Sequence, residues 1–281
     1  MNTVRTIARL DVKGPNLVKG IHLEGLRVLG QPEDFSKFYY QQGADELFYQ
    51  DVVASLYNRN GLHDLISNVA KFSFVPLTVG GGIRSIEDIK TMLKAGADKV
   101  AINTAAINNP GLITEAANTF GSSTIVVTIE AAKQSDGNYL AFTDNGREYT
   151  GVEVVSWAQR AEELGAGELV ITSIDKEGTG EGYDYDLLEQ VTSKVTVPVV
   201  AHGGAGQLDD IGKAVKCNVN ALAFASVLHY DFLKNNIPST SSKEGNTEFL
   251  KKGMAFGKIS PFSIEQIKSY MVSHQIPCRT L

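Results

Sequence analysis

Short apolar runs alternate with helix-period segments along most of the chain, and this alternation constrains the fold more than any other feature. Amphipathic stretches typical of helices lie at 85–95, 112–120, 152–164 and 208–216. A doubly wound open sheet would carry GxGxxG after its first strand, and this sequence has none there. Strands separated by helices predict a parallel sheet, and eight of them predict an α/β domain closed into a (β/α)8 barrel, the TIM barrel. The eight runs span 5–11, 46–51, 75–79, 99–103, 124–130, 168–172, 197–201 and 221–225.

The two halves of the chain resemble each other at an offset of 122 residues. At this offset the segment 76–82 (PLTVGGG) falls without a gap on 198–204 (PVVAHGG). Chance similarity between strand–helix turns is one explanation, and duplication of a four-unit half-barrel is the other. The gapless register favours duplication. We therefore expect one domain over 1–281, with half-barrels at about 1–122 and 123–230.

Two segments interrupt the alternation. The segment 134–149 has alternating apolar and polar residues followed by Asp-Asn-Gly, which predicts a small hairpin after the fifth strand. The segment 235–246 is polar and rich in serine, and we expect it to belong to an insertion at about 231–260. A last helix is expected at about 263–275, where it would dock the C-terminus.

Composition excludes several functional classes. The chain has 26 Lys and Arg against 32 Asp and Glu, a net charge of −6, so it is a poor candidate for binding nucleic acid. It has two cysteines, Cys217 and Cys278, and no CxxC motif, which fits a reducing compartment and offers no structural metal site. An apolar signal segment and a run of 18 apolar residues are both absent. We therefore expect a cytoplasmic protein that binds neither membrane nor metal.

Glycines follow three of the expected strands. They are Gly-Gly-Gly at 80–82 after the third, Gly178 after the sixth, and Gly-Gly at 203–204 after the seventh. Asn-Thr at 103–104 and Ala-Ser at 225–226 end the fourth and eighth strands. Glycine lets the backbone turn its N–H groups toward an anion. Because these strand pairs lie opposite each other in a ring, the pattern predicts two facing phosphate sites and a bisphosphorylated small molecule. Glycines that only permit tight turns are the alternative.

Two carboxylates end the first and fifth strands, which also lie opposite each other. They are Asp11 and Glu130, and paired carboxylates in different environments can divide the acid and base roles of catalysis. Capping of a neighbouring turn is the alternative role for each. Lys19 follows the first strand in a loop that contains glycine, where it would either cover a phosphate or remain solvated.

Charged residues also gather at the opposite end of the expected barrel. Side chains alternate along a strand, so Arg5 shares the inward face with Asp11. Two residues of each sign near the strand N-termini would form a closed ring of salt bridges under the core, and a purely stabilising plug is the alternative. The four residues are Arg5, Glu46, Lys99 and Glu168.

Long motifs over about residues 1–230 carry a family resemblance: LDVK, GADELFYQD, PLTVGGGI, GADKVAINTAA, TSIDKEGTGEGYD, HGGAG and ALAFASVLHY. Together they resemble the HisF family, the cyclase subunits of imidazole glycerol phosphate synthase in histidine biosynthesis. In that family, ammonia from a glutaminase (HisH-like) subunit enters the bottom of the barrel through a charged gate. It attacks a bisphosphorylated ribulosyl formimino aminoimidazole carboxamide ribotide at the top, which gives imidazole glycerol phosphate and aminoimidazole carboxamide ribotide. The resemblance implies a lyase of this kind that needs no cofactor.

The resemblance also implies roles for individual residues. Asp11 matches the general base, Glu130 occupies the position of the acid, and Asp98 matches a contact with the glutaminase. The implied ammonia gate is Arg5, Glu46, Lys99 and Glu168. The implied phosphate and substrate contacts are Lys19, Asp51, Gly82, Asn103, Thr104, Thr172, Glu177, Gly178, Gly204, Ala225 and Ser226.

Three residues of the active face depart from the family pattern. Glu130 stands where the family has Asp, and a carboxylate moved by about 1 Å can lose on the order of 100-fold in rate. Arg9 replaces a usual cysteine and places a cation below Asp11, and His202 replaces a small serine-like residue. These changes leave open a HisF-like paralogue that delivers ammonia to an acetamido sugar. The isomerase that precedes the cyclase and a non-catalytic glutaminase activator are further alternatives.

Overall fold

The computed structural model describes residues 3–54, 62–236 and 258–280 and contains a closed barrel of parallel strands. Each barrel strand pairs in parallel with the next, and the ring closes through β12 and β1. The predicted (β/α)8 barrel is therefore confirmed. Its strands are β1 (Arg5–Lys13), β4 (Glu46–Asp51), β5 (Leu77–Gly80), β6 (Lys99–Ile102), β7 (Ile125–Lys133), β10 (Glu168–Ser173), β11 (Val199–His202) and β12 (Ala221–Phe224).

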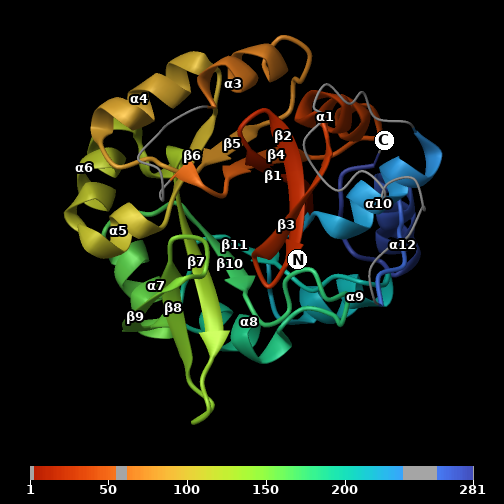
Figure 1. Ribbon diagram of the computed structural model, residues 1–281. Helices are drawn as coiled ribbons and strands as arrows, with labels where there is room; N and C mark the ends of the chain where they lie inside the picture. The colour runs from red at the N-terminus through yellow and green to blue at the C-terminus, as the bar shows by residue number, and fades with distance from the viewer. Residues whose placement is uncertain (1–2, 55–61, 237–257, 281) are drawn as a thin grey trace.

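Helices surround the strands as an outer ring (Figure 1). Local sequence sets their ends: the Ser85 side chain caps the start of α4 by accepting from the Asp88 N–H, and Gly96 ends it at a φ of 118°. The helices are α1 (Pro32–Gln41), α3 (His63–Val69), α4 (Ile86–Ala95), α5 (Thr104–Asn108), α6 (Gly111–Phe120), α7 (Val154–Glu163), α8 (Tyr185–Thr192), α9 (Asp209–Lys216), α10 (Ser226–Asn235) and α12 (Ile264–Ser273), with a short 3₁₀ turn at Ser122–Thr124.

Alternation along the strands divides the core into two parts. Outward-facing residues such as Leu10 pack against the helices in a large apolar cluster. Inward-facing residues form a separate apolar layer inside the barrel, which is the division that the period of two predicts. The inner layer consists of Ile7, Phe48, Ala101, Val126, Val170, Val200, Ala221 and Ala223.

Two hairpins stand on the face where the strands end. The predicted hairpin in 134–149 is confirmed: β7 pairs antiparallel with β8 (Tyr139–Thr143), which pairs with β9 (Glu148–Glu153). The expectation of a loop after the first strand is wrong, because β2 (Asn16–Ile21) and β3 (Glu24–Gly30) form a second hairpin there.

The second hairpin lacks the usual turn signal. Its turn residues, His22 (φ 54°) and Leu23 (φ 62°), lie in the left-handed region that glycine and asparagine favour. Long-range contacts hold them there, since the Leu23 N–H donates to a Glu177 carboxylate oxygen at 2.9 Å and the His22 N–H donates to the Glu177 carbonyl at 2.9 Å. The periodicity of the sequence does not predict such long-range contacts.

The C-terminal part of the chain returns to the barrel through α12. Ser263 and Gln266 form a capping box at its start. The Val4 N–H donates to the Pro277 carbonyl at 2.8 Å, so the tail reaches the beginning of β1. The predicted insertion at about 231–260 lies mostly outside the described residues, since 237–257 are not among them.

A buried ion pair anchors α12, and we expect its loss to be costly. Lys268 Nζ lies 2.6 and 2.5 Å from the two carboxylate oxygens of Asp45, which also accepts from the Thr6 N–H. Lys268→Met leaves a buried charge without its partner, so urea unfolding should show a loss of roughly 3–5 kcal/mol in the free energy of unfolding. The exposed Lys90–Glu87 pair offers a control, because Lys90→Met should cost under about 1 kcal/mol. Equal effects of the two changes would contradict the assignment.

Candidate active site

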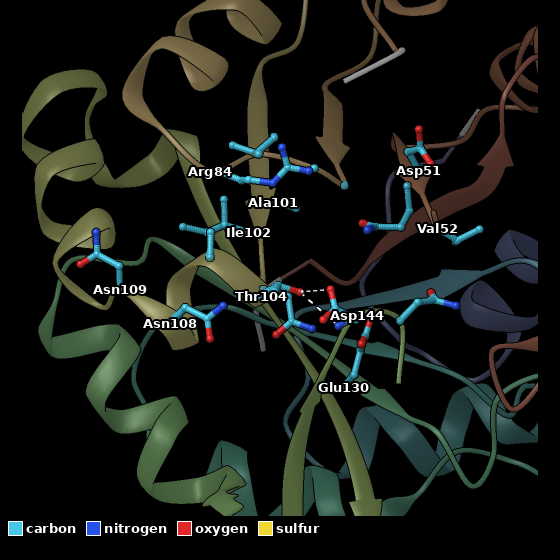
Figure 2. A pocket seen from close by; sticks show the side chains of 17 residues that line it. Asp51, Val52, Arg84, Ala101, Ile102, Thr104, Asn108, Asn109, Glu130 and Asp144 are labelled. Atoms are coloured by element: carbon cyan, nitrogen blue, oxygen red, sulfur yellow. Dashed lines mark hydrogen bonds between the residues drawn. The ribbon is translucent and has the colours of Figure 1, made fainter. Parts of the chain in front are cut away.

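A cavity of about 460 Å³ opens on the face where β4, β5, β6 and β7 end. In Figure 2, Asp144 lies between Thr104 and Glu130, and Arg84 lies across the cavity from them. The cavity brings together five residues that the sequence singled out: Asp51, Gly82, Asn103, Thr104 and Glu130.

The glycines after β5 shape one wall of this cavity. Gly81 has a φ of 99°, and a Cβ there would lie 2.3 Å from the Asp51 carbonyl oxygen, so only glycine fits. Thr104 begins α5, and its hydroxyl accepts from the Asp144 N–H at 3.1 Å. Arg84 supplies a cation to the same cavity, with Nη2 donating to the Ala54 carbonyl at 2.9 Å. This wall can therefore receive an anion.

A second, smaller hollow lies on the opposite side of the barrel, where β11 and β12 end. Gly204 has a φ of 112°, and a Cβ there would meet the Gly182 carbonyl oxygen at 2.1 Å. Ser226 opens the ten-residue helix α10 beside it, and a helix N-terminus favours a negative ligand. The predicted residues at this hollow are Glu177, Gly178, Gly204, Ala225 and Ser226.

Glu130 faces the first cavity and is largely buried. Only 6% of its surface is exposed, and Oε2 accepts from the Gly146 N–H at 2.8 Å. Burial raises the pKa of Glu130 to about 7, and the negative charges of Asp11 and Asp144 act in the same direction. The Gly146 hydrogen bond and the Arg9 charge lower that pKa, but burial outweighs them. A carboxyl group that holds its proton near neutrality can serve as a general acid.

Asp11 comes from β1, which lies opposite β7 in the ring. Its carboxylate is buried and accepts from Arg9 Nε at 2.9 Å. Asp11 does not line the 460 Å³ cavity, so it lies apart from the wall that carries Glu130. The two carboxyl groups thus have different surroundings: Asp11 is ion-paired with a guanidinium, and Glu130 accepts from a backbone N–H.

Lys19 and Glu177 form a buried ion pair with each other, so Lys19 is not a solvated loop lysine. Thr172 also has a partner: its hydroxyl lies 3.1 Å from Nδ1 of His202. Burial lowers the pKa of His202 well below its ordinary value, helped by the positive charges of Arg9 and Lys19. His202 is therefore a neutral, hydrogen-bonded side chain at the floor of the second hollow.

The four charged residues at the other end of the barrel form the closed ring that the sequence predicts. Arg5 bridges Glu46 and Glu168, and Lys99 Nζ lies 3.1 Å from Glu46 and 3.0 Å from Glu168. Each acid contacts both bases, so the charges are balanced around the barrel axis. Asp98 is exposed next to this ring, and its carboxylate accepts from the Leu77 N–H.

Sequence reasoning missed several residues of the first cavity. Arg84 had a signal, since it stands two residues after the glycine run. Asp144 and Asn145 had none, because the β8–β9 turn alone brings them over Glu130. Within residues 3–54, 62–236 and 258–280 we find no cluster of three side chains suited to a metal ion and no helix that could cross a membrane.

Comparisons with known proteins agree on one family. The family model of a histidine biosynthesis protein matches residues 5–234. The imidazole glycerol phosphate synthase subunit HisF of Legionella pneumophila is 56% identical over 210 residues, covering 75% of this chain and 99% of the relative. The subunit of the same name from Lactococcus lactis is 44% identical over 256 residues, covering 87% and 99%. That of Streptomyces griseus is 44% identical over 231 residues, covering 82% and 92%.

Proposed function

This chain belongs to the histidine biosynthesis protein family, and we propose that it is the cyclase subunit of an imidazole glycerol phosphate synthase. The reaction is the ammonia-dependent conversion of a bisphosphorylated ribulosyl formimino aminoimidazole carboxamide ribotide into imidazole glycerol phosphate and aminoimidazole carboxamide ribotide. The observation that carries the proposal is the pair of glycine-lined sites on opposite sides of the barrel mouth, with Glu130 lining the first and Asp11 on the strand opposite Glu130.

Each glycine-lined site would hold one phosphate of the substrate. At the first, Gly82, Asn103 and Thr104 offer backbone and side-chain donors, and Arg84 adds a positive charge. At the second, Gly178, Gly204 and Ser226 offer backbone donors next to the N-terminus of α10. Anchoring both ends would place the middle of the substrate over the barrel axis, where bond formation occurs.

The two carboxyl groups would divide the proton transfers. Asp11 is assigned as the base, since its neighbour Arg9 offsets the negative charge that a base must carry. Glu130 is assigned as the acid, since burial raises its pKa to about 7 and keeps a proton available near neutrality. The β8–β9 turn holds Glu130 in place through the Gly146 N–H.

Ammonia would enter from the end of the barrel that carries the charged ring. We assign Arg5, Glu46, Lys99 and Glu168 as the gate, because their closed ring sits across the axis below the apolar inner layer. The resemblance to HisF subunits implies a glutaminase partner, and we place that partner on this face, where Asp98 is exposed. The two unpaired cysteines suit a cytoplasmic location.

The names of the relatives do not favour the sugar-amidating paralogue or the isomerase. An isomerase would also make no use of ammonia. The test is turnover of the bisphosphorylated substrate by the purified protein, with ammonium chloride as the nitrogen source and no partner. Aminoimidazole carboxamide ribotide should appear only when ammonium is present. If the folded protein consumes no substrate at a high concentration of ammonium, the proposal is refuted.

A further inference from the structure

The side chain of Arg9 lies inside the barrel between the apolar inner layer and the active face. Only 3% of it is exposed, and its guanidinium carbon lies 5.2 Å from the centre of the Phe48 ring, which belongs to that layer. Arg9 pairs in register with Phe48 on β4, and Ile7 of the inner layer precedes it on the inward face of β1. A molecule that rises along the axis from the charged ring therefore meets Arg9 before it reaches Asp11.

Arg9 has hydrogen-bond donors to spare. A guanidinium carries five N–H donors, and within the described part of the chain the one hydrogen bond that Arg9 makes runs from Nε to Asp11. The two terminal nitrogens have no such partner there. The apolar layer next to them consists of alkyl groups and an aromatic ring, which provide no strong acceptor. These donors can therefore bind a small molecule that accepts a hydrogen bond.

The charges around Arg9 come from several strands. Asp11 offsets its charge directly, Lys19 is paired with Glu177, and His202 is neutral. Glu130 lies on the opposite strand. Below the apolar layer, the charged ring contains two acids and two bases in contact. The Arg9–Asp11 pair is therefore close to neutral overall, and its guanidinium lies against Phe48 of the apolar layer.

We propose that the free N–H groups of Arg9 form a binding site for neutral ammonia, halfway along the barrel. Ammonia has a lone pair that accepts a hydrogen bond from a guanidinium and N–H groups that can donate to the Asp11 carboxylate. Ammonium has no lone pair, so it cannot accept a hydrogen bond from the guanidinium. This site rests on the proposed function, because it has a use only if ammonia travels through the barrel.

The test compares two sources of nitrogen in the complex with the glutaminase subunit of the same organism. Glutamine-supported turnover needs passage through the barrel, whereas ammonium chloride can reach the open active face directly. Arg9→Met removes the charge and the donors and leaves a shorter, unbranched apolar side chain. The ratio of glutamine-supported to ammonium-supported turnover should then fall about tenfold, as expected for the loss of a hydrogen bond from a charged group. Leu10→Met, on the same strand but facing the helices, should leave the ratio unchanged.

Arg9→Lys separates the site from the effect on Asp11. It keeps a positive charge beside Asp11 and loses the fork of donors, so ammonium-supported turnover should recover while the ratio stays low. Arg9→Lys also tests the ammonia site if Arg9→Met fails to fold. An unchanged ratio in these variants would mean that Arg9 acts only on Asp11. A higher ratio would mean that the Arg9 side chain obstructs the passage of ammonia. Either result overturns the inference. Absence of ammonium-supported turnover in the unaltered protein would instead refute the proposed function itself.

Discussion

Asp11→Asn should lower ammonium-supported turnover by about 100- to 10,000-fold, the range expected when a general base is removed. The amide has the shape of the carboxylate. Its oxygen can still accept a hydrogen bond from Arg9 Nε, which donates to Asp11 at 2.9 Å in the unaltered protein. It cannot take up a proton. Because Asp11 lies on β1, away from both glycine-lined walls, affinity for inorganic phosphate should stay within about twofold of the unaltered protein. Turnover and calorimetric titration with phosphate would measure the two effects.

The control for this change is Asp136→Asn. Asp136 is fully exposed in the turn between β7 and β8, so the same change in charge there should leave turnover unaltered. Asp11→Asn also leaves the buried Arg9 without its counter-charge, and thermal unfolding should confirm that the variant is folded. Retained activity in a folded Asp11→Asn protein would remove Asp11 from the chemistry.

The position of the site follows largely from local sequence. The alternation of strands and helices gives a ring, and the ring puts every strand end on one face, so Asp11 and Glu130 could be predicted to lie on opposite sides of the mouth. The glycines at 80–82 and 203–204 could be assigned to that face for the same reason. The inward direction of Arg5, Lys99 and Glu168 follows from side-chain parity, and Glu46 is placed by its position at the start of its strand.

The partners of these residues could not be predicted in the same way. Lys19 is paired with Glu177 because the β2–β3 hairpin folds back over the barrel, and the turn of that hairpin uses His22 and Leu23 rather than glycine. Gly146 reaches Glu130 through the β8–β9 turn. Such contacts join loops that are distant in sequence, and they are set by packing rather than by periodicity. The pKa of Glu130 depends on them and on burial, so its role as the acid needed the structure.

Glu130→Gln should lower turnover by roughly 100- to 10,000-fold and remove a limb of the pH profile. The acid works only while protonated, so turnover of the unaltered protein should fall as the pH rises through about 7, the pKa of Glu130. The amide cannot titrate, so the residual activity of the variant should lack this fall. The concentration of free ammonia must be held constant across the pH series. Glu115→Gln, on the exposed face of α6, should keep the unaltered profile.

The same substitution should stabilise the fold at high pH. The pKa of Glu130 is raised from 4.5 to about 7 in the folded protein, so ionisation costs the folded state more than the unfolded one. The cost is absent below 4.5, grows as the pH rises, and is complete above about 7, where a shift of this size corresponds to about 3 kcal/mol. The Gln variant should therefore gain stability over the unaltered protein in urea at about pH 8 and gain little at about pH 5. An equal difference at both pH values would show that Glu130 is already ionised at neutrality, and it would then lose its assignment as the acid.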